Sequence, residues 1–397
     1  MNKFVGLLKY IFDIKDIIWF LLGIMIPIVY MKLRDKSRRR AIRKRIRREE
    51  IKFEDNGIVS LGHGDPFYLI GNGRTDIVID APKEEFYISM PQDIKQEILK
   101  FNPKFFNTHW DKEQSFLDGQ TEEEMINEIS SVISQTYEET NKIFEEEKIN
   151  VAKLLLSKVQ AGQPYFNGEK YGIKRMDAGR LDEKEIPTIR IQSYKCDYYT
   201  HRVMGAIYQR IYKENPSIVP NDQLDKYNTM RYFLTSMGMN ILLILEDENV
   251  IIFGKRSGNL INMDKDRWHV SMNEGVSITD LSEINGTISL EKCIIRGINE
   301  ELGYNAVNPN IYYSDIFFLK NPFETGISAF VKMSGLSYSQ LEIAYSAAKD
   351  RELETAMLKK VKYNAASLKE FIDKNDLTDA AQYLIKMLLA RHMKGAI

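Results

Sequence analysis

The chain has 397 residues, of which 44% are hydrophobic and 11% aromatic, so it carries enough apolar material for two or three domains with buried cores. Its two cysteines, Cys196 and Cys293, are too few for a disulfide framework and indicate buried thiols in a reducing compartment. No CxxC pair and no HExxH spacing occurs, which excludes the common zinc motifs.

The formal net charge of −1 hides a strong asymmetry along the chain. Residues 1–50 carry 14 basic and 5 acidic residues, a net charge of +9, whereas the remaining 347 residues carry 41 and 51, a net charge of −10. A basic N-terminal segment on an otherwise acidic chain needs a local explanation, and the residue pattern of that segment provides one.

The stretch 17–31, "IIWFLLGIMIPIVYM", has no charged residue. It is short for a bilayer core, which takes ~20 residues, but the flanking lysines can snorkel and so lengthen the span. Trp19 and Tyr30 lie near its two ends, where interfacial aromatic residues are common. We therefore predict a single-pass membrane anchor over residues 1–33. Residues 4–14 either continue the span or lie as an interfacial helix.

Residues 32–48 hold eleven basic residues among seventeen. The positive-inside rule then predicts an inner-membrane protein whose large C-terminal part is cytoplasmic, with the basic segment 34–50 against anionic inner-membrane lipid. A cleaved signal peptide is disfavoured because arginines stand where small residues would precede cleavage. Nucleic-acid binding by this run is disfavoured because it directly follows an apolar span, and we expect no direct DNA or RNA binding.

The middle region, residues 51–237, is predicted to be mixed α+β. A hairpin is expected around Gly71-Asn72-Gly73, and a long helix over 121–159 that starts at a Thr121/Glu124 capping-box pattern. Residues 186–211 read as a strand running into a helix. The polar and aromatic cluster 198–202 at that helix start is compatible with phosphate binding or with packing against a neighbouring domain. No other site is recognisable here.

From Asn240 the pattern becomes that of a small mixed sheet with helices against it. Two apolar runs around a polar turn at 246–249 predict a hairpin. The stretch "CIIRGINEELGY" has apolar residues at helical spacing and a glycine where a C-terminal cap would lie. Further strands are expected at 311–319, 326–333 and within 350–363, followed by helical residues 367–393.

These residues resemble a Nudix domain. The hairpin ending in Gly254-Lys255-Arg256, the Trp268 segment and "RGINEELGY" carry the resemblance, which covers about residues 238–390. The family signature is Gx5Ex7REUxEExGU, where U is aliphatic. Its second half is matched by residues that lie on or next to the predicted helix: Arg296, Ile298, Glu300, Glu301 and Gly303.

Two acids of the signature are missing. Gly297 stands where the family has a glutamate that usually binds metal, and Ile288 stands at the upstream acid position. Glu291 lies at the wrong offset to replace either. The loop before the helix is longer than usual and lacks the GG-x5-GE form.

The resemblance implies Mg²⁺ or Mn²⁺ held by Glu300, Glu301 and a distant acid, for which Glu354 in "DRELET" is the first choice. It also implies Glu301 and Arg296 as catalytic residues for hydrolysis of a nucleotide diphosphate linkage.

The same resemblance implies that Arg256, Trp268 and Glu274 bind the nucleotide. The predicted α/β fold is thus a transmembrane helix, a mixed α+β middle region, and a C-terminal Nudix-like α/β/α sandwich over residues 238–397.

The pairing of a span with a Nudix-like domain resembles the membrane-anchored Nudix effectors of bacterial CBASS anti-phage systems. That resemblance implies activation by a cyclic oligonucleotide and cell death or arrest, delivered by the membrane segment, the Nudix pocket or both. Because one span cannot enclose a pore, membrane disturbance requires a homo-oligomer on activation. Three hypotheses follow: an effector whose assembled spans disturb the membrane, a membrane-tethered Nudix hydrolase unrelated to defence, and a catalytically inactive Nudix-like nucleotide sensor.

Overall fold

The structure is a computed structural model that describes residues 58–60, 76–106, 113–163, 165–181, 186–219, 224–257, 265–282, 286–321, 323–348 and 355–394, together with residues 33 and 37. Residues 53–389 form one compact unit, which is described below; residues 1–52 and 390–397 form the other. The predicted membrane segment 17–31, the hairpin at 71–73 and Glu354 lie outside the described residues.

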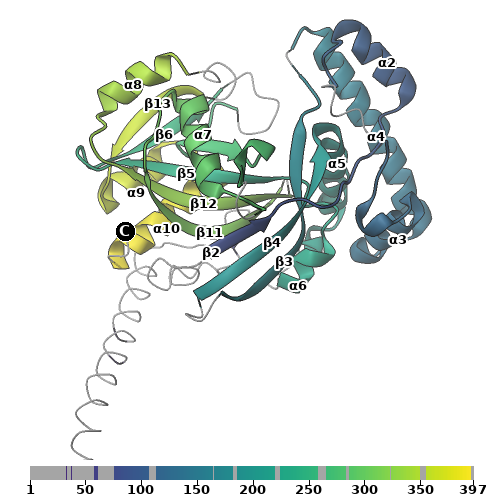
Figure 1. The fold of residues 1–397 in the computed structure, drawn as a ribbon, viewed down its shortest axis with the longest axis horizontal. Coiled ribbons are helices and arrows are strands. Elements are labelled where there is room, and N and C mark those ends of the chain that lie inside the picture. The colour runs from purple at the N-terminus through teal and green to yellow at the C-terminus, as the bar shows by residue number, and fades with distance from the viewer. Residues whose placement is uncertain are drawn as a thin grey trace, which may run out of the picture. The chain divides into compact units, whose positions relative to one another are not determined.

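An eight-stranded sheet forms the centre of the C-terminal region (Figure 1). Its main strand order is β1-β11-β12-β5-β6-β13, with β7 beside β6 and β8 beside β5. β12 and β5 run parallel, and the other pairs are antiparallel. The strands are β1 (Ile58–Ser60), β5 (Met237–Leu245), β6 (Val250–Arg256), β7 (Trp268–His269), β8 (Met272–Gly275), β11 (Asn310–Lys320), β12 (Phe323–Met333) and β13 (Thr355–Lys362).

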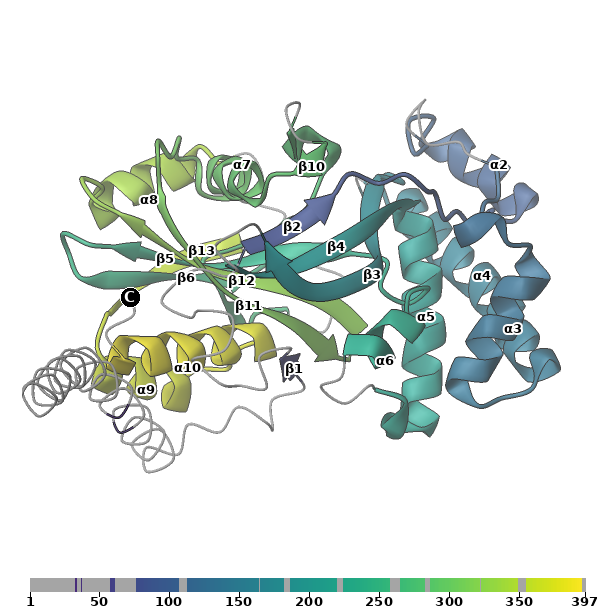
Figure 2. The same ribbon diagram turned by 60° about the horizontal axis from the view of Figure 1, so that its bottom comes forward.

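Helices cover both faces of this sheet (Figure 2). One face carries α7 (Leu290–Leu302) and α8 (Tyr338–Ser346), and the other carries α9 (Ala365–Lys374) and α10 (Asp379–Lys394). On the second face Phe371 of α9 packs on Phe253 at 4.5 Å between ring centroids, and Tyr383 of α10 packs on Phe317 at 5.3 Å. The predicted mixed sheet between helices is therefore present.

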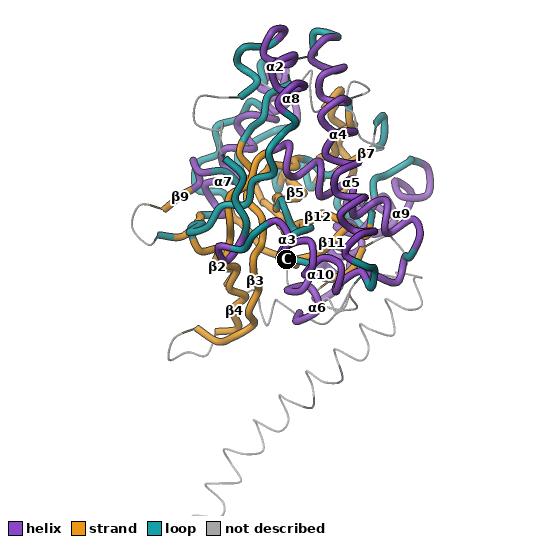
Figure 3. Tube along the Cα trace, turned by 90° about the vertical axis from the view of Figure 1, so that its right-hand side faces the viewer, coloured by secondary structure: helices purple, strands orange, loops and turns teal. Residues whose placement is uncertain are grey.

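A second sheet has the strand order β3-β4-β2-β10-β9. Figure 3 shows its two long strands, β3 and β4, side by side. Its two short strands β9 and β10 come from the segment between β8 and α7, so the loop before the predicted Nudix helix pairs with the middle region. The strands are β2 (Asp76–Asp80), β3 (Glu169–Leu181), β4 (Ile186–Asp197), β9 (Leu281–Ser282) and β10 (Thr287–Ile288).

The middle region also contributes a layer of helices (Figure 1). They are α2 (Gln92–Phe101), α3 (Glu122–Ile133), α4 (Tyr137–Gln160), α5 (Tyr198–Glu214) and α6 (Leu224–Thr229). The prediction of one helix over 121–159 is wrong. Ser134 adopts a left-handed conformation with φ 57°, and a second capping box at Thr136 and Glu139 starts a new helix directly after it.

One hydrophobic core joins the middle region to the eight-stranded sheet. Tyr227 of α6 stacks on Phe318 at 4.0 Å between ring centroids, and Tyr208 of α5 stacks on Phe323 at 4.7 Å. The Tyr208 hydroxyl also donates to the Lys320 carbonyl at 2.8 Å. The domain boundary between residues 237 and 238 stays a prediction, and the described core crosses it without a break.

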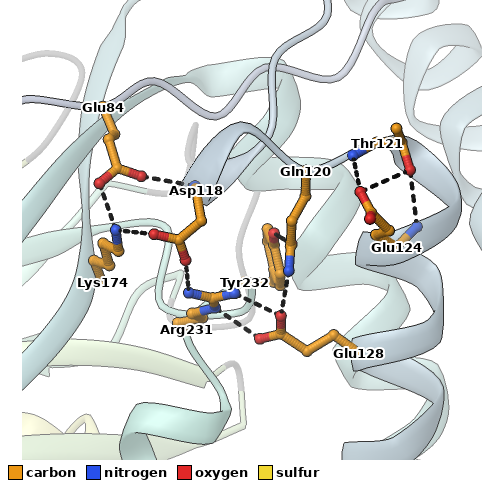
Figure 4. A network of polar contacts seen from close by, with 9 residues as sticks. All are labelled: Glu84, Asp118, Gln120, Thr121, Glu124, Glu128, Lys174, Arg231 and Tyr232. Carbon is orange, nitrogen blue, oxygen red and sulfur yellow. Dashed lines mark hydrogen bonds and ion pairs between the residues drawn. The ribbon is translucent and has the colours of Figure 1, made fainter.

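A polar network holds the 3₁₀ turn Leu117–Gly119 against β3 and α3 (Figure 4). Lys174 binds Glu84 and Asp118, while Arg231 binds Asp118 and, through Nε at 2.7 Å, Glu128. The hydrogen bond from Lys174, with a further one from Arg231, lowers the pKa of Asp118. Each of the two cations is thus shared between two acids.

Within the described ranges, every helix is either too short or too polar to cross a bilayer.

Candidate functional site

Helix α7 forms as its sequence predicts. The Ser289 hydroxyl caps it by accepting from the Lys292 N–H at 3.2 Å, and Ile294, Ile298 and Leu302 bury one face. It ends at Gly303, where φ is 67°. A Cβ at Gly303 would collide with the Ala344 carbonyl oxygen, so α8 passes too close for any other residue.

Arg296 projects from α7 into a group of three carboxylates. Its Nη1 lies 2.8 Å from Glu274 Oε1 and 3.3 Å from Glu300 Oε2. Its Nε and Nη2 donate to the two oxygens of Asp280 at 3.1 and 2.9 Å, and Nη2 also donates to the Gly275 carbonyl at 2.7 Å. Glu300 lies one helical turn after Arg296, and this i,i+4 ion pair is only one of the three that Arg296 makes here.

The 3₁₀ turn Ile278–Asp280 presents Asp280 to the arginine. Asp280 is 1% exposed, and its Oδ2 also accepts from the Ser277 N–H at 2.8 Å. Burial alone lowers the pKa of Arg296, but the hydrogen bonds to Asp280 and the charge of Glu274 outweigh it, so that the pKa rises. Arg296 therefore stays charged at every ordinary pH.

Glu300 and Glu301 point in different directions despite being adjacent. Glu300 faces Arg296, whereas Glu301 is 4% exposed and its Oε1 accepts from the Asn273 N–H of β8 at 3.0 Å. The carboxylate of Glu301 thus tethers α7 to β8. The two acids that the resemblance assigns to one metal make separate structural contacts.

Gly297 leaves no room for the glutamate that the Nudix signature has at this position. A Cβ there would lie 2.5 Å from Met272 Sδ and 2.8 Å from Glu274 Cβ. The close approach of α7 to β8 therefore requires glycine, and a longer side chain would force the two elements apart.

The residues described here do not fit a Mg²⁺ or Mn²⁺ site. Such ions take several carboxylate oxygens, yet Glu301 is bound to backbone and Glu300 to an arginine. Across the described ranges, His, Cys, Asp and Glu form no group of three or more that could hold a metal ion. Glu354 lies outside those ranges, so its assignment as a ligand stays a prediction.

A hollow of about 340 Å³ lies at the C-terminal end of α7, lined by Arg296, Asn299, Glu300, Gly303 and Ala347. Sequence reasoning found Arg296 and Glu300 but missed Asp280 and the contribution of Ala347. The Ser277-x-x-Asp280 capping pattern was the available signal for Asp280.

The three residues assigned to the nucleotide lie in two places. Glu274 belongs to the Arg296 cluster. Trp268 packs edge-on against Phe371 of α9 at 5.8 Å, with Lys359 Nζ 5.2 Å from its ring centroid. Arg256 ends β6 and donates its N–H to the Arg267 carbonyl, beside Trp268. Their roles in nucleotide binding stay predictions.

The start of α5 favours packing over phosphate binding. The Asp197 carboxylate caps this helix, accepting from the Thr200 N–H at 2.7 Å and from Asn167 Nδ2 at 2.8 Å. Burial raises the pKa of Asp197. Because this acid already occupies the helix N-terminus, an anion would have to displace it.

The sequence matches no protein-family model and no curated protein. Solved structures with partial likeness include the following three. A Deinococcus radiodurans protein has 10% identity and a TM-score of 0.28, with 38% of this chain and 82% of that one covered. A MutT/Nudix family protein from Listeria innocua has 13% identity and a TM-score of 0.29, with 40% and 95% covered. A bifunctional NMN adenylyltransferase/ADP-ribose pyrophosphatase from Francisella tularensis, complexed with AMP and a Mn ion, has 12% identity and a TM-score of 0.26, with 48% of each chain covered. Nudix proteins are thus among the structural neighbours, but likeness at these TM-scores carries no further argument.

Proposed function

We propose that this chain is a membrane-tethered effector whose Nudix-like part receives a signal without hydrolysing a nucleotide. The signal is a cyclic oligonucleotide of an anti-phage CBASS system, and the N-terminal segment delivers the toxicity. The proposal draws on the uncharged run 17–31, the basic run that follows it, and the Nudix-like helix.

One observation carries the non-hydrolytic part of the proposal: the metal-binding positions of the signature are used for structure. Gly297 has no space for an acid, and Glu301 binds the backbone of β8. Metal-assisted phosphoryl chemistry needs a cation that neutralises charge developing on phosphate oxygens. These residues leave no place where the helix could hold one.

The hollow beside Glu300 is also a poor phosphate site. Three carboxylates surround a single guanidinium there, so the local charge is negative and repels an anionic ligand. We therefore expect the cyclic oligonucleotide to bind outside this hollow, elsewhere in the Nudix-like part.

The second candidate is a tethered Nudix hydrolase for a nucleotide diphosphate. Glu300 borders the hollow and is 30% exposed, which favours this candidate. In that case Glu354 would supply a ligand from outside the described residues.

The test is growth of a bacterial host that expresses the full chain together with a cyclic-oligonucleotide synthase. We expect the wild type to arrest growth, Glu300→Gln/Glu301→Gln to arrest it equally, and deletion of residues 1–33 to abolish arrest. Gln keeps the acceptor oxygen that Asn273 uses, so the double variant should fold. Glu291→Gln, an exposed change on the same helix, is the matched control. Loss of arrest in the double variant alone would favour the hydrolase.

A further inference from the structure

The carboxylates of Glu274, Asp280 and Glu300 come from three elements, β8, the 3₁₀ turn Ile278–Asp280 and α7, and meet at one point. That point is the guanidinium of Arg296, which contacts all three at 2.8 to 3.3 Å. A planar guanidinium with a fork of N–H donors suits this arrangement because it can bind one carboxylate with two parallel bonds and still reach others.

We propose that Arg296 is the resident cation of this acidic cluster and that it binds Glu300, the one acid of the cluster that the Nudix resemblance assigns to a divalent ion, in place of that ion. The inference deepens the non-hydrolytic part of the proposed function and does not depend on the identity of the signal. It follows that neither the stability of this cluster nor the arrangement of its carboxylates depends on a divalent metal ion.

Two features of the cluster support this assignment over a metal that shares the acids with Arg296. Both oxygens of Asp280 already accept from Arg296, and Asp280 is 1% exposed. A hard divalent ion keeps much of its hydration and needs several oxygens at about 2 Å, which a buried and bidentately bound carboxylate cannot offer.

The remaining charged groups nearby do not change this balance. Lys292 of α7 donates to the Leu281 carbonyl at 3.0 Å. The ammonium of Lys170, from β3, lies close to Gly275 and adds positive charge at the edge of the cluster. Arg296 remains the group that all three carboxylates share.

The first measurement is Mn²⁺ binding to the detergent-solubilised full chain, followed by the loss of the free-ion electron paramagnetic resonance signal. The wild type and Glu300→Gln are compared. We expect no bound Mn²⁺ that depends on Glu300, and no difference in Tm between EDTA and Mn²⁺. A Mn²⁺ ion bound by the wild type and lost in Glu300→Gln would overturn the proposal.

The second measurement separates a counter-charge from simple packing. Arg296→Met keeps an unbranched apolar side chain but removes the guanidinium and its charge, and we expect it to lower Tm by roughly 5 °C. Neutralising the acids in the same chain, with Glu274→Gln and Glu300→Gln added, should recover at least half of that loss. An equal loss with and without the two Gln changes means that Arg296 acts through packing, which contradicts the proposal. Arg296→Lys, which keeps a cation, is the matched control and should lose less than Arg296→Met.

The effector role and the role of Arg296 can be refuted independently of each other. Absence of growth arrest in the wild type refutes the effector role and leaves the Mn²⁺ result intact. A Glu300-dependent Mn²⁺ ion refutes the role of Arg296 even where growth arrest is observed.

Discussion

At the scale of single residues, Gly297 determines how closely α7 packs on β8 and whether the helix has space for a metal-binding acid. Its missing side chain lets the helix lie against Met272 and Glu274 of β8, and that same closeness removes the space for a metal-binding acid. The sequence showed that the acid was absent, but not that its place was filled. The filling of this place is visible only in the packing of α7 on β8, which no local sequence pattern encodes.

Gly297→Glu should therefore not restore a metal site. Because the new Cβ would lie 2.8 Å from Glu274 Cβ, which is fixed to the backbone of β8, we expect a loss of about 2 kcal/mol in the free energy of unfolding. Urea denaturation measures it, with Asn299→Glu as the exposed control on the same helix, expected within about 0.5 kcal/mol of wild type. A fully stable Gly297→Glu variant that binds Mn²⁺ would refute this account of the helix.

His201 makes stability depend on pH. Burial, with Lys170 and Arg202 nearby, lowers its pKa to about 3, so the folded protein holds it neutral. Its Nδ1 lies 2.8 Å from Thr235 Oγ1, and the 4.0 Å approach of Nε2 to Glu324 is not an ion pair while the ring is neutral.

The unfolded chain takes up this proton below pH ~6.5, so stability is complete above that pH and is lost as the pH falls toward 3. We expect the free energy of unfolding to fall by up to about 1.4 kcal/mol per pH unit from this group. Buried His269, whose pKa is also lowered by burial, adds a similar slope. Urea denaturation at pH 7, 6 and 5 should show a smaller slope for His201→Gln than for wild type. An unchanged slope contradicts the assignment.

At the scale of elements, the helices and strands with strong local signals were predictable. The 186–211 strand-to-helix segment, the hairpin around 246–249 and the Gly303 cap all appear as expected. The break between α3 and α4 was missed because apolar spacing continues across it. The Thr136/Glu139 box, a repeat of the Thr121/Glu124 pattern, was the signal that marked the second start.

Substitutions at this break distinguish two helices from one. Thr136→Val should cost about 1 kcal/mol because it removes an N-cap, as should Thr121→Val, its matched counterpart. Ser134→Gly should be neutral or stabilising, since glycine accepts the left-handed conformation at φ 57°. In one continuous helix the glycine would instead destabilise, so the sign of its effect in urea denaturation decides between the two.

At the scale of the whole described unit, segments far apart in sequence pair as strands and pack in one core. β10, from the segment before α7, pairs with β2 through Ile288↔Ile79, and the hairpin β11–β12 packs its aromatic rings on α5 and α6. Contacts across roughly one hundred to two hundred residues of chain leave no local trace, so the sequence predicted two regions but not their shared core.

A fragment covering residues 238–397 should consequently not fold stably alone. It would expose Phe318 and Phe323, which Tyr227 and Tyr208 cover, and would leave β10 without β2. We expect it to aggregate or to show no cooperative thermal transition by circular dichroism. The matched control is residues 53–397, which keeps the partners and should unfold cooperatively. A cooperative transition of the shorter fragment at the same Tm would contradict the shared core.

The most direct test of the central claim is nucleotide hydrolysis by the purified, detergent-solubilised full chain. It is incubated with Mg²⁺ or Mn²⁺ and a panel of cyclic di- and trinucleotides and linear nucleotide diphosphates, and the products are separated by chromatography. Because Arg296 holds the acidic cluster and Gly297 leaves no place for a metal-binding acid, we expect no product beyond that of Glu300→Gln/Glu301→Gln run alongside. Cleavage of a diphosphate by the wild type that disappears in the double variant would contradict the account and identify a working hydrolase.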